Sequence, residues 1–151
     1  MPSVTVIEQM PCRSNIVFDL LHDYSRRLEW DTLLREARFT SGHTTAAVGA
    51  TTLCIGRPLL GLIGIETSYI TFTPGVVAAV NMINTPPFFD SFAASIRHQD
   101  TQAGSIVTYK FSFRARPRLL RWFFEPIMLI VLRYETKRRL RALSRYLELV
   151  P

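Results

Sequence analysis

The chain has 151 residues, of which 48% are hydrophobic and 20% charged, a globular composition that excludes an intrinsically disordered chain. This length suits a single domain, and we expect residues 1–151 to form one. The longest uninterrupted apolar run, residues 126–132, is far shorter than the ~20 residues that cross a bilayer. No basic start followed by an apolar run marks a signal peptide, so we expect a cytoplasmic protein.

The net charge of +6 is concentrated near the C-terminal end. Residues 1–113 carry eight basic and nine acidic side chains, whereas residues 114–151 carry ten basic and three acidic ones. This asymmetry is typical of a segment that meets an anionic surface or partner. A solvated helix face whose arginines pair with acids elsewhere gives the same pattern, so both interpretations stay open.

The sequence contains none of the usual catalytic or metal-binding motifs. Cys12 and Cys54 stand alone, which is typical of reduced thiols. His22, His43 and His98 lack the mutual spacing of metal ligands. There is no HExxH, GxSxG, P-loop or GxGxxG motif. We therefore expect neither a metal nor a cofactor.

The elements predicted from the N-terminus are a strand, two short helices and a second strand. Residues 3–9 alternate in hydrophobicity, as a half-buried strand does. Ser14 or Asn15 can cap the first helix. A second short helix is expected over residues 24–30, and residues 33–40 read as the next strand.

The middle of the chain has the pattern of an antiparallel meander. Five strand-like runs alternate with turn formers, and such short connections favour antiparallel pairing. Side chains two apart share a face of a strand, which groups the apolar residues of the last two strands. The five runs are residues 51–55, 65–73, 76–83, 89–98 and 105–114.

The C-terminal part predicts helix. Pro117 suits the first position of a helix, and Pro126 should interrupt it. We therefore expect a short helix at 117–124 and a long one from residue 126. Leucines at steps of three and four give the long helix an apolar stripe. The complete order of elements indicates an α+β fold. The stripe consists of Leu129, Leu132, Leu140, Leu143 and Leu147.

Two stretches resemble a known superfamily. Residues 10–23 read MPCRSNIVFDLLHD, and YSRRLEWD follows at 24–31. They resemble the opening of the START-like (SRPBCC) superfamily, in particular its polyketide cyclase/dehydrase and lipid-transport branch. Residues 118–148 are similar to that branch's closing helix. The resemblance implies a helix-grip fold, in which a curved antiparallel sheet of about seven strands surrounds a long C-terminal helix, with two short helices after the first strand.

The resemblance also implies a cavity between the sheet and the final helix that binds an apolar small molecule or lipid. The fold alone does not separate a carrier from an enzyme. A carrier or binding module is therefore the first hypothesis, and a polyketide cyclase or dehydratase is the alternative. An interaction module that uses its basic helix comes third. Nucleic acid is not expected as a partner, because no recognition motif is present.

Residues on the concave face of this implied fold are candidates to line the cavity. Trp30 suits the core equally well, and Asp31 is expected to brace the turn after it. If a reaction is catalysed, Tyr109 and His98 are the candidate acid/base residues. Asp90 is predicted to share a strand face with Phe92 and Ile96, although side chains at the ends of strands often point into solvent. The ligand-binding candidates are Trp30, Phe92, Ala94, Ile96, Tyr109, Phe111, Phe113 and Met128.

Two further segments suggest how a ligand could be exchanged. Residues 56–64 (GRPLLGLIG) place apolar side chains between glycines and suit either a lid or ordinary strand continuation. The outer face of the long helix is apolar at its start, around Ile130 and Tyr134, and basic toward its end. Its basic side chains are Arg133, Lys137, Arg138, Arg141 and Arg145. We expect this face to contact a membrane surface peripherally, with a homodimer as the other way to cover it.

Overall fold

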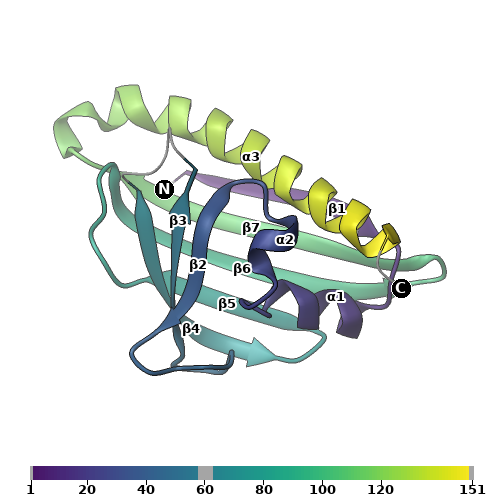
Figure 1. Ribbon diagram of the computed structural model, residues 1–151. Helices are drawn as coiled ribbons and strands as arrows, with labels where there is room; N and C mark the ends of the chain where they lie inside the picture. The colour runs from purple at the N-terminus through teal and green to yellow at the C-terminus, as the bar shows by residue number, and fades with distance from the viewer. Residues whose placement is uncertain (1, 58–62, 150–151) are drawn as a thin grey trace.

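The computed structural model describes residues 2–57 and 63–149, and these form a seven-stranded antiparallel sheet with a long helix across it (Figure 1). The strand order is β1-β7-β6-β5-β4-β3-β2, so the first strand pairs with the last. The expected α+β helix-grip architecture is thereby confirmed. The strands are β1 (Ser3–Met10), β2 (Leu34–Thr40), β3 (Thr51–Gly56), β4 (Gly64–Thr73), β5 (Val77–Met82), β6 (Phe89–Thr101) and β7 (Gly104–Ala115). The helices are α1 (Ser14–Leu21), α2 (Arg27–Trp30) and α3 (Arg121–Leu149).

The hairpin of β6 and β7 is longer than the sequence suggested. Pairing continues to Thr101 and Gly104, because Asp100 extends the strand instead of opening the turn. The carboxylate of Asp100 accepts a hydrogen bond of 2.8 Å from the backbone N–H of Ser14. It therefore satisfies a free donor at the start of α1, a role that we had expected of the side chains of Ser14 or Asn15. The hairpin and α1 are tied together at this point.

The expected break at Pro126 is wrong. A short 3-10 turn (Arg118–Leu120) leads directly into α3, which runs without interruption to Leu149. A proline inside a helix removes one hydrogen bond, here the one that the carbonyl of Trp122 would accept. Trp122 lies in the exposed first turn, where water can satisfy that carbonyl, so the helix continues.

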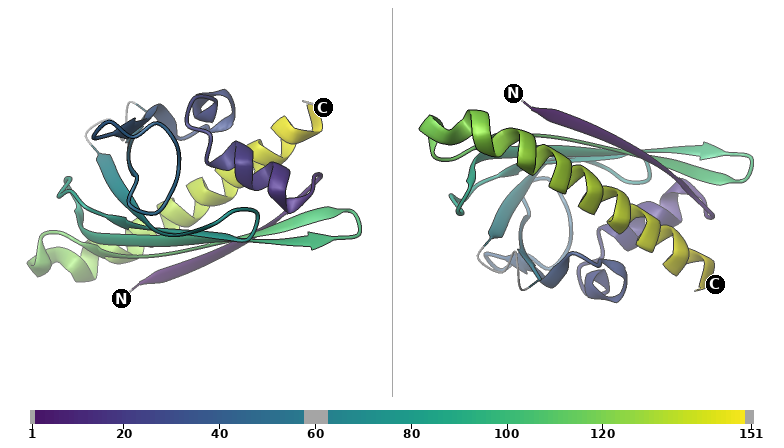
Figure 2. Two further views of the ribbon diagram at one scale, coloured as in Figure 1. Left: turned by 90° about the horizontal axis from the view of Figure 1, so that it is seen from below. Right: turned by 90° about the horizontal axis from the view of Figure 1, so that it is seen from above.

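The two halves of α3 have different surroundings. The helix crosses the sheet obliquely, packs against β1, β7 and α2, and ends beside α1 (Figure 2). Leu140, Leu143 and Leu147 in its second half are buried in the main core, as their spacing predicts. Leu129 and Leu132 in the first half are only half-buried. The second half therefore closes the core, and the first half leaves space above the sheet.

A second, smaller core lies beneath α1 and contains two buried histidines. The rings of His22 and His98 pack against Phe18, with centroids 4.5 and 5.3 Å away. Burial lowers the pKa of His22 to about 3, and the charge of Arg27 adds to the effect. Burial also lowers the pKa of His98 to about 4. Both side chains are therefore neutral at pH 7.

These histidines predict a loss of stability in mild acid. The unfolded chain binds protons at its histidines near pH 6.5, whereas the folded protein does not until pH 3 to 4. Protons therefore favour the unfolded state between these limits. The free energy of unfolding should fall by about 1.4 kcal/mol per pH unit for each histidine as the pH decreases from 6.5. Urea unfolding at several pH values from 7 to 5 measures this slope.

The variant His22→Gln isolates one contribution. It should reduce the dependence of the unfolding free energy on pH by the contribution of one histidine, about 1.4 kcal/mol per pH unit. His43→Gln is the matched control, because His43 is exposed and should leave the slope unchanged. A wild-type slope in a folded His22→Gln protein would contradict the assignment.

Candidate ligand-binding cavity

A cavity of about 400 Å³ lies between the sheet and the first half of α3. Its size falls within the usual range of small-molecule sites. Most of its walls are apolar, and small or β-branched side chains on β4 and β5, such as Ile65, Thr67 and Val80, leave the space open on the sheet side. From α3, the side chains of Met128 and Leu132 cover it.

Five of the eight predicted ligand-binding residues line this cavity: Phe92, Ile96, Tyr109, Phe111 and Met128. The four from β6 and β7 come together because alternate residues of these strands face α3, and Met128 reaches the cavity from α3 itself. Their contact with a ligand stays a prediction.

The other three, Trp30, Ala94 and Phe113, are not part of the cavity wall in the described structure. All three are buried in the main core instead. Trp30 lies under the guanidinium group of Arg27, which is 5.0 Å from its ring centroid. Phe113 has no exposed surface and packs against Phe89. Their side chains therefore belong to the packed core that adjoins the cavity.

Two polar candidates lie away from the cavity wall. A β-bulge between Phe89 and Ser91 reverses the alternation of β6 at Asp90. Asp90 consequently faces outward and forms an ion pair of 2.7 Å with Arg121. His98 lies beyond the cavity, beneath α1, as described above. Of the two candidate acid/base residues, only Tyr109 borders the cavity.

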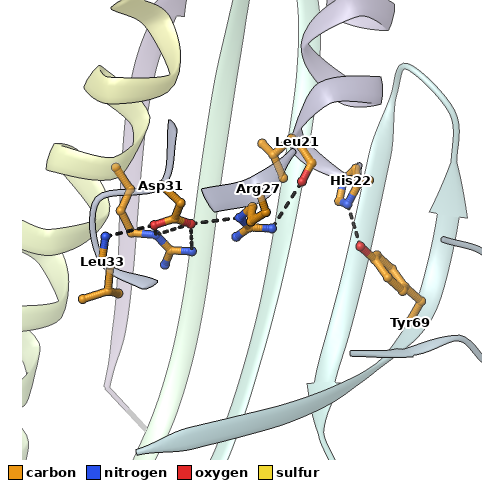
Figure 3. A network of polar contacts seen from close by, with 7 residues as sticks. Leu21, His22, Arg27, Asp31, Leu33 and Tyr69 are labelled. Carbon is orange, nitrogen blue, oxygen red and sulfur yellow. Dashed lines mark hydrogen bonds and ion pairs between the residues drawn. The ribbon is translucent and has the colours of Figure 1, made fainter. Parts of the chain in front are cut away.

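A buried ionic network lies at the inner end of the cavity (Figure 3). Asp31 has a fully buried side chain and accepts hydrogen bonds from Arg27 Nε at 2.9 Å and from Arg139 Nη2 at 2.8 Å. The backbone N–H of Leu33 donates to the same carboxylate at 3.1 Å. Burial alone would raise the pKa of Asp31, but Arg139 and Arg27 hold it at about 2. The carboxylate is therefore charged at neutral pH.

The network connects α2 to α3. Arg27 also donates to the carbonyl of Leu21 at 3.2 Å, and its guanidinium lies 5.2 Å from the ring centroid of Tyr24. Arg139 reaches Asp31 from the middle of α3. The bracing role expected of Asp31 agrees with these contacts, but sequence reasoning missed both arginines. The spacing of Arg27 and Asp31 by four residues was an available signal for the first.

Further polar groups on the wall come from the end of α1, from β3 and from β4. Nδ1 of His22 lies 2.7 Å from the hydroxyl group of Tyr69, and the two side chains face each other in Figure 3. Burial raises the pKa of Tyr69 and that of the nearby Cys54 thiol. With His22 neutral, these groups can exchange hydrogen bonds with a ligand. None of them is a base poised near neutral pH.

The mouth of the cavity is marked by residues that line it and are also exposed. Phe88, Ile127 and Val131 are 44%, 48% and 42% exposed, respectively. The adjoining outer face of α3 is apolar, as expected, and the basic side chains farther along the helix are exposed too. The exposed apolar residues beside the mouth are Leu119, Trp122, Phe123, Ile130 and Tyr134.

The segment expected to form a lid lies mostly outside the described residues. Gly56 and Ile63, which flank the undescribed part, border the cavity. Within residues 2–57 and 63–149, no three His, Cys, Asp or Glu side chains are grouped so that they could hold a metal ion. None of the described helices is both long and apolar enough to span a bilayer.

Solved structures of similar shape extend over nearly the whole chain. A START superfamily protein from Mycobacterium smegmatis has a TM-score of 0.78 at 7% identity, with 99% of each chain covered. The protein TTHA0849 from Thermus thermophilus has a TM-score of 0.77 at 9% identity, with 97% of each chain covered. XoxI from Bacillus cereus has a TM-score of 0.76 at 13% identity, with 97% of this chain and 96% of that one covered. At such low identity, these likenesses show the fold alone.

The sequence itself carries the family assignment. No curated protein matches the chain. The sequence model of the family described as polyketide cyclase/dehydrase and lipid transport, however, matches residues 1–148. This match agrees with the helix-grip architecture and with the cavity beneath α3. The chain therefore belongs to the polyketide cyclase/dehydrase and lipid-transport family.

Proposed function

We propose that this protein binds an apolar small molecule or lipid in the cavity beneath α3 and carries it to or from a membrane surface. The observation that supports the proposal most directly is the cavity itself, which has mostly apolar walls and a mouth beside exposed aromatic side chains. Each ligand methylene group that leaves water for such walls contributes about 0.8 kcal/mol. A chain of about ten such groups supplies roughly the free energy of micromolar binding, before the cost of association is subtracted.

The alternative, a cyclase or dehydratase reaction in the same cavity, has less support. General acid/base catalysis works best with a group whose pKa lies near the operating pH. His98 lies away from the cavity wall, and burial lowers the pKa of His22 to about 3. Tyr109 remains on the wall, where its hydroxyl group can orient a polar part of the ligand. The arrangement therefore favours binding over catalysis.

Filling the cavity should weaken binding. Met128 lies on the wall, so Met128→Trp places a larger side chain in the space that a ligand would occupy. We expect the affinity for the neutral fluorescent probe N-phenyl-1-naphthylamine to fall about tenfold, a loss of ~1.4 kcal/mol. A fluorescence titration measures it, and mass spectrometry of an organic extract of the purified protein identifies any ligand that it already carries.

Ile130→Trp is the matched control, because Ile130 lies two residues along the same helix but is 71% exposed. It should bind the probe as the wild type does. Equal probe binding by both folded variants would show that the probe, and so the proposed ligand, does not occupy this cavity.

The membrane contact rests on the position and chemistry of the outer face of α3. Trp122, Ile130 and Tyr134 are exposed beside the mouth, while Arg133 and Lys137 are exposed close by on the same helix. Apolar side chains of this kind can enter the headgroup region, and each cation near an anionic surface contributes about 1 kcal/mol. A ligand could then pass between the cavity and the bilayer without crossing bulk water.

Flotation with lipid vesicles tests this contact. The protein should float with anionic vesicles at low salt and much less with neutral vesicles or at high salt, because salt screens the cations. The double variant Trp122→Ser/Ile130→Ser should partition at least about tenfold less, since it loses two apolar side chains. Leu149→Ser is the control, because Leu149 is 82% exposed at the far end of the helix.

The competing explanation for the apolar face is a dimer. If the wild type does not float under any condition and sediments as a dimer that Trp122→Ser/Ile130→Ser dissociates, the face is a protein interface and the membrane proposal is wrong.

A further inference from the structure

The inner end of the cavity presents positive charge. Arg27 and Arg139 both line the cavity, whereas Asp31 is not part of its wall. The carboxylate therefore lies behind the two guanidinium groups, with no exposed side-chain surface. Two arginines and one carboxylate leave one positive charge that is not neutralised within the network.

Each arginine also keeps part of its hydrogen-bonding capacity. Arg27 uses Nε and Nη1, and Arg139 uses Nε and Nη2. No hydrogen-bond partner within residues 2–57 and 63–149 is found for Nη2 of Arg27 or Nη1 of Arg139. Both side chains are largely buried, with 7% and 15% of their surface exposed. Neither of these two nitrogens is among the fully buried atoms that lack a partner, so each keeps some surface on which a ligand group can bind.

One acidic residue shares this wall. Glu135 lies on α3, one helical turn before Arg139, and borders the cavity. No ion pair joins it to either arginine in the part of the chain that the structure describes. Glu135 is half-buried, so water can solvate its carboxylate. The carboxylate of Asp31, in contrast, is fully buried. The carboxylate of Glu135 weakens the positive potential without occupying the free guanidinium donors.

We infer that the ligand of this cavity is an amphiphile with a singly charged carboxylate head, held by Arg27 and Arg139, and an apolar tail directed toward the mouth. This inference rests on the proposed function. A guanidinium group matches the planar carboxylate with two parallel donors. A single negative charge neutralises the single excess positive charge of the network. Arg139 lies twelve residues after Ile127 of the mouth, which at 1.5 Å per residue is about 18 Å, long enough for an extended tail.

Displacement of N-phenyl-1-naphthylamine by two compounds of equal chain length tests the inference. Dodecanoate carries the carboxylate, and dodecanol is uncharged. At about pH 8, where dodecanoate is ionised, it should displace the probe at a concentration at least about tenfold lower than dodecanol does, a difference of ~1.4 kcal/mol. This comparison uses the wild-type protein, so it does not depend on the folding of any variant.

Variants then assign the preference to the arginine. In Arg139→Gln, Asp31 is still paired with Arg27, so the excess charge is gone. The ratio between the concentrations of dodecanol and dodecanoate that displace the probe should then fall to about one, whatever the overall affinity of the variant. Arg138→Gln is the matched control, because Arg138 is exposed and should retain the preference. Glu135→Gln should increase the preference, because it removes the opposing charge from the wall.

The outcomes separate the inference from the proposed function. Equal displacement by dodecanoate and dodecanol in the wild type would overturn the carboxylate head and leave apolar binding in place. A preference that persists in a folded Arg139→Gln protein would also overturn it. If neither compound displaces the probe and the probe does not bind, the proposed function fails and the inference fails with it.

Discussion

The carboxylate of Asp31 is the interaction on which the position of α3 depends. It has no contact with solvent, so its charge is stabilised by the hydrogen bonds from both arginines and from the N–H of Leu33. These groups come from α2, from the residue before β2 and from the middle of α3. Breaking such a buried pair typically costs about 3–5 kcal/mol, a large part of the stability of a small domain. The helix therefore cannot slide or lift at Arg139 without losing this energy.

A second set of contacts fixes the beginning of the same helix. Glu125 accepts a hydrogen bond of 2.9 Å from the backbone N–H of Ala115, and Arg121 donates to the carbonyl of Ala115 at 2.9 Å. The helix is thus held at the end of β7 and again at Asp31, with roughly four turns between these points. Beyond Arg139, leucine side chains of α3 fill the space above the sheet. The part of α3 between the two fixed points covers the cavity. The cavity lies where the helix is held above the part of the sheet that carries Ile65, Thr67 and Val80.

The sequence predicts the elements and the sheet well, because strand alternation and the leucine stripe are local consequences of which side faces the core. The predictions made from the sequence are wrong where a contact with a distant residue overrides the local preference of the chain. Asp100 is a residue type typical of turns, but in the fold it continues the strand and accepts a hydrogen bond from the start of α1. The bulge at Asp90 reverses the alternation of inward and outward side chains in β6, and no residue type in that strand indicates it. Placing Leu129 at zero and advancing 100° per residue puts Arg139 at about 280°, beside the leucine stripe. That angle was a signal for a buried arginine, but its partner, Asp31, could be found only from the fold.

The pairing of the first strand with the last has a consequence for how the chain folds. Val6 lies opposite Tyr109, so the two partners are separated by about two thirds of the sequence. Contacts this distant close large loops and slow the search for the native state. During synthesis, β1 leaves the ribosome before β7, and it cannot be paired until β7 has been made. During that interval, the apolar side chains of β1 have neither their strand partner nor the second half of α3 to cover them. The newly made chain is therefore most prone to aggregate before β7 and the second half of α3 have left the ribosome.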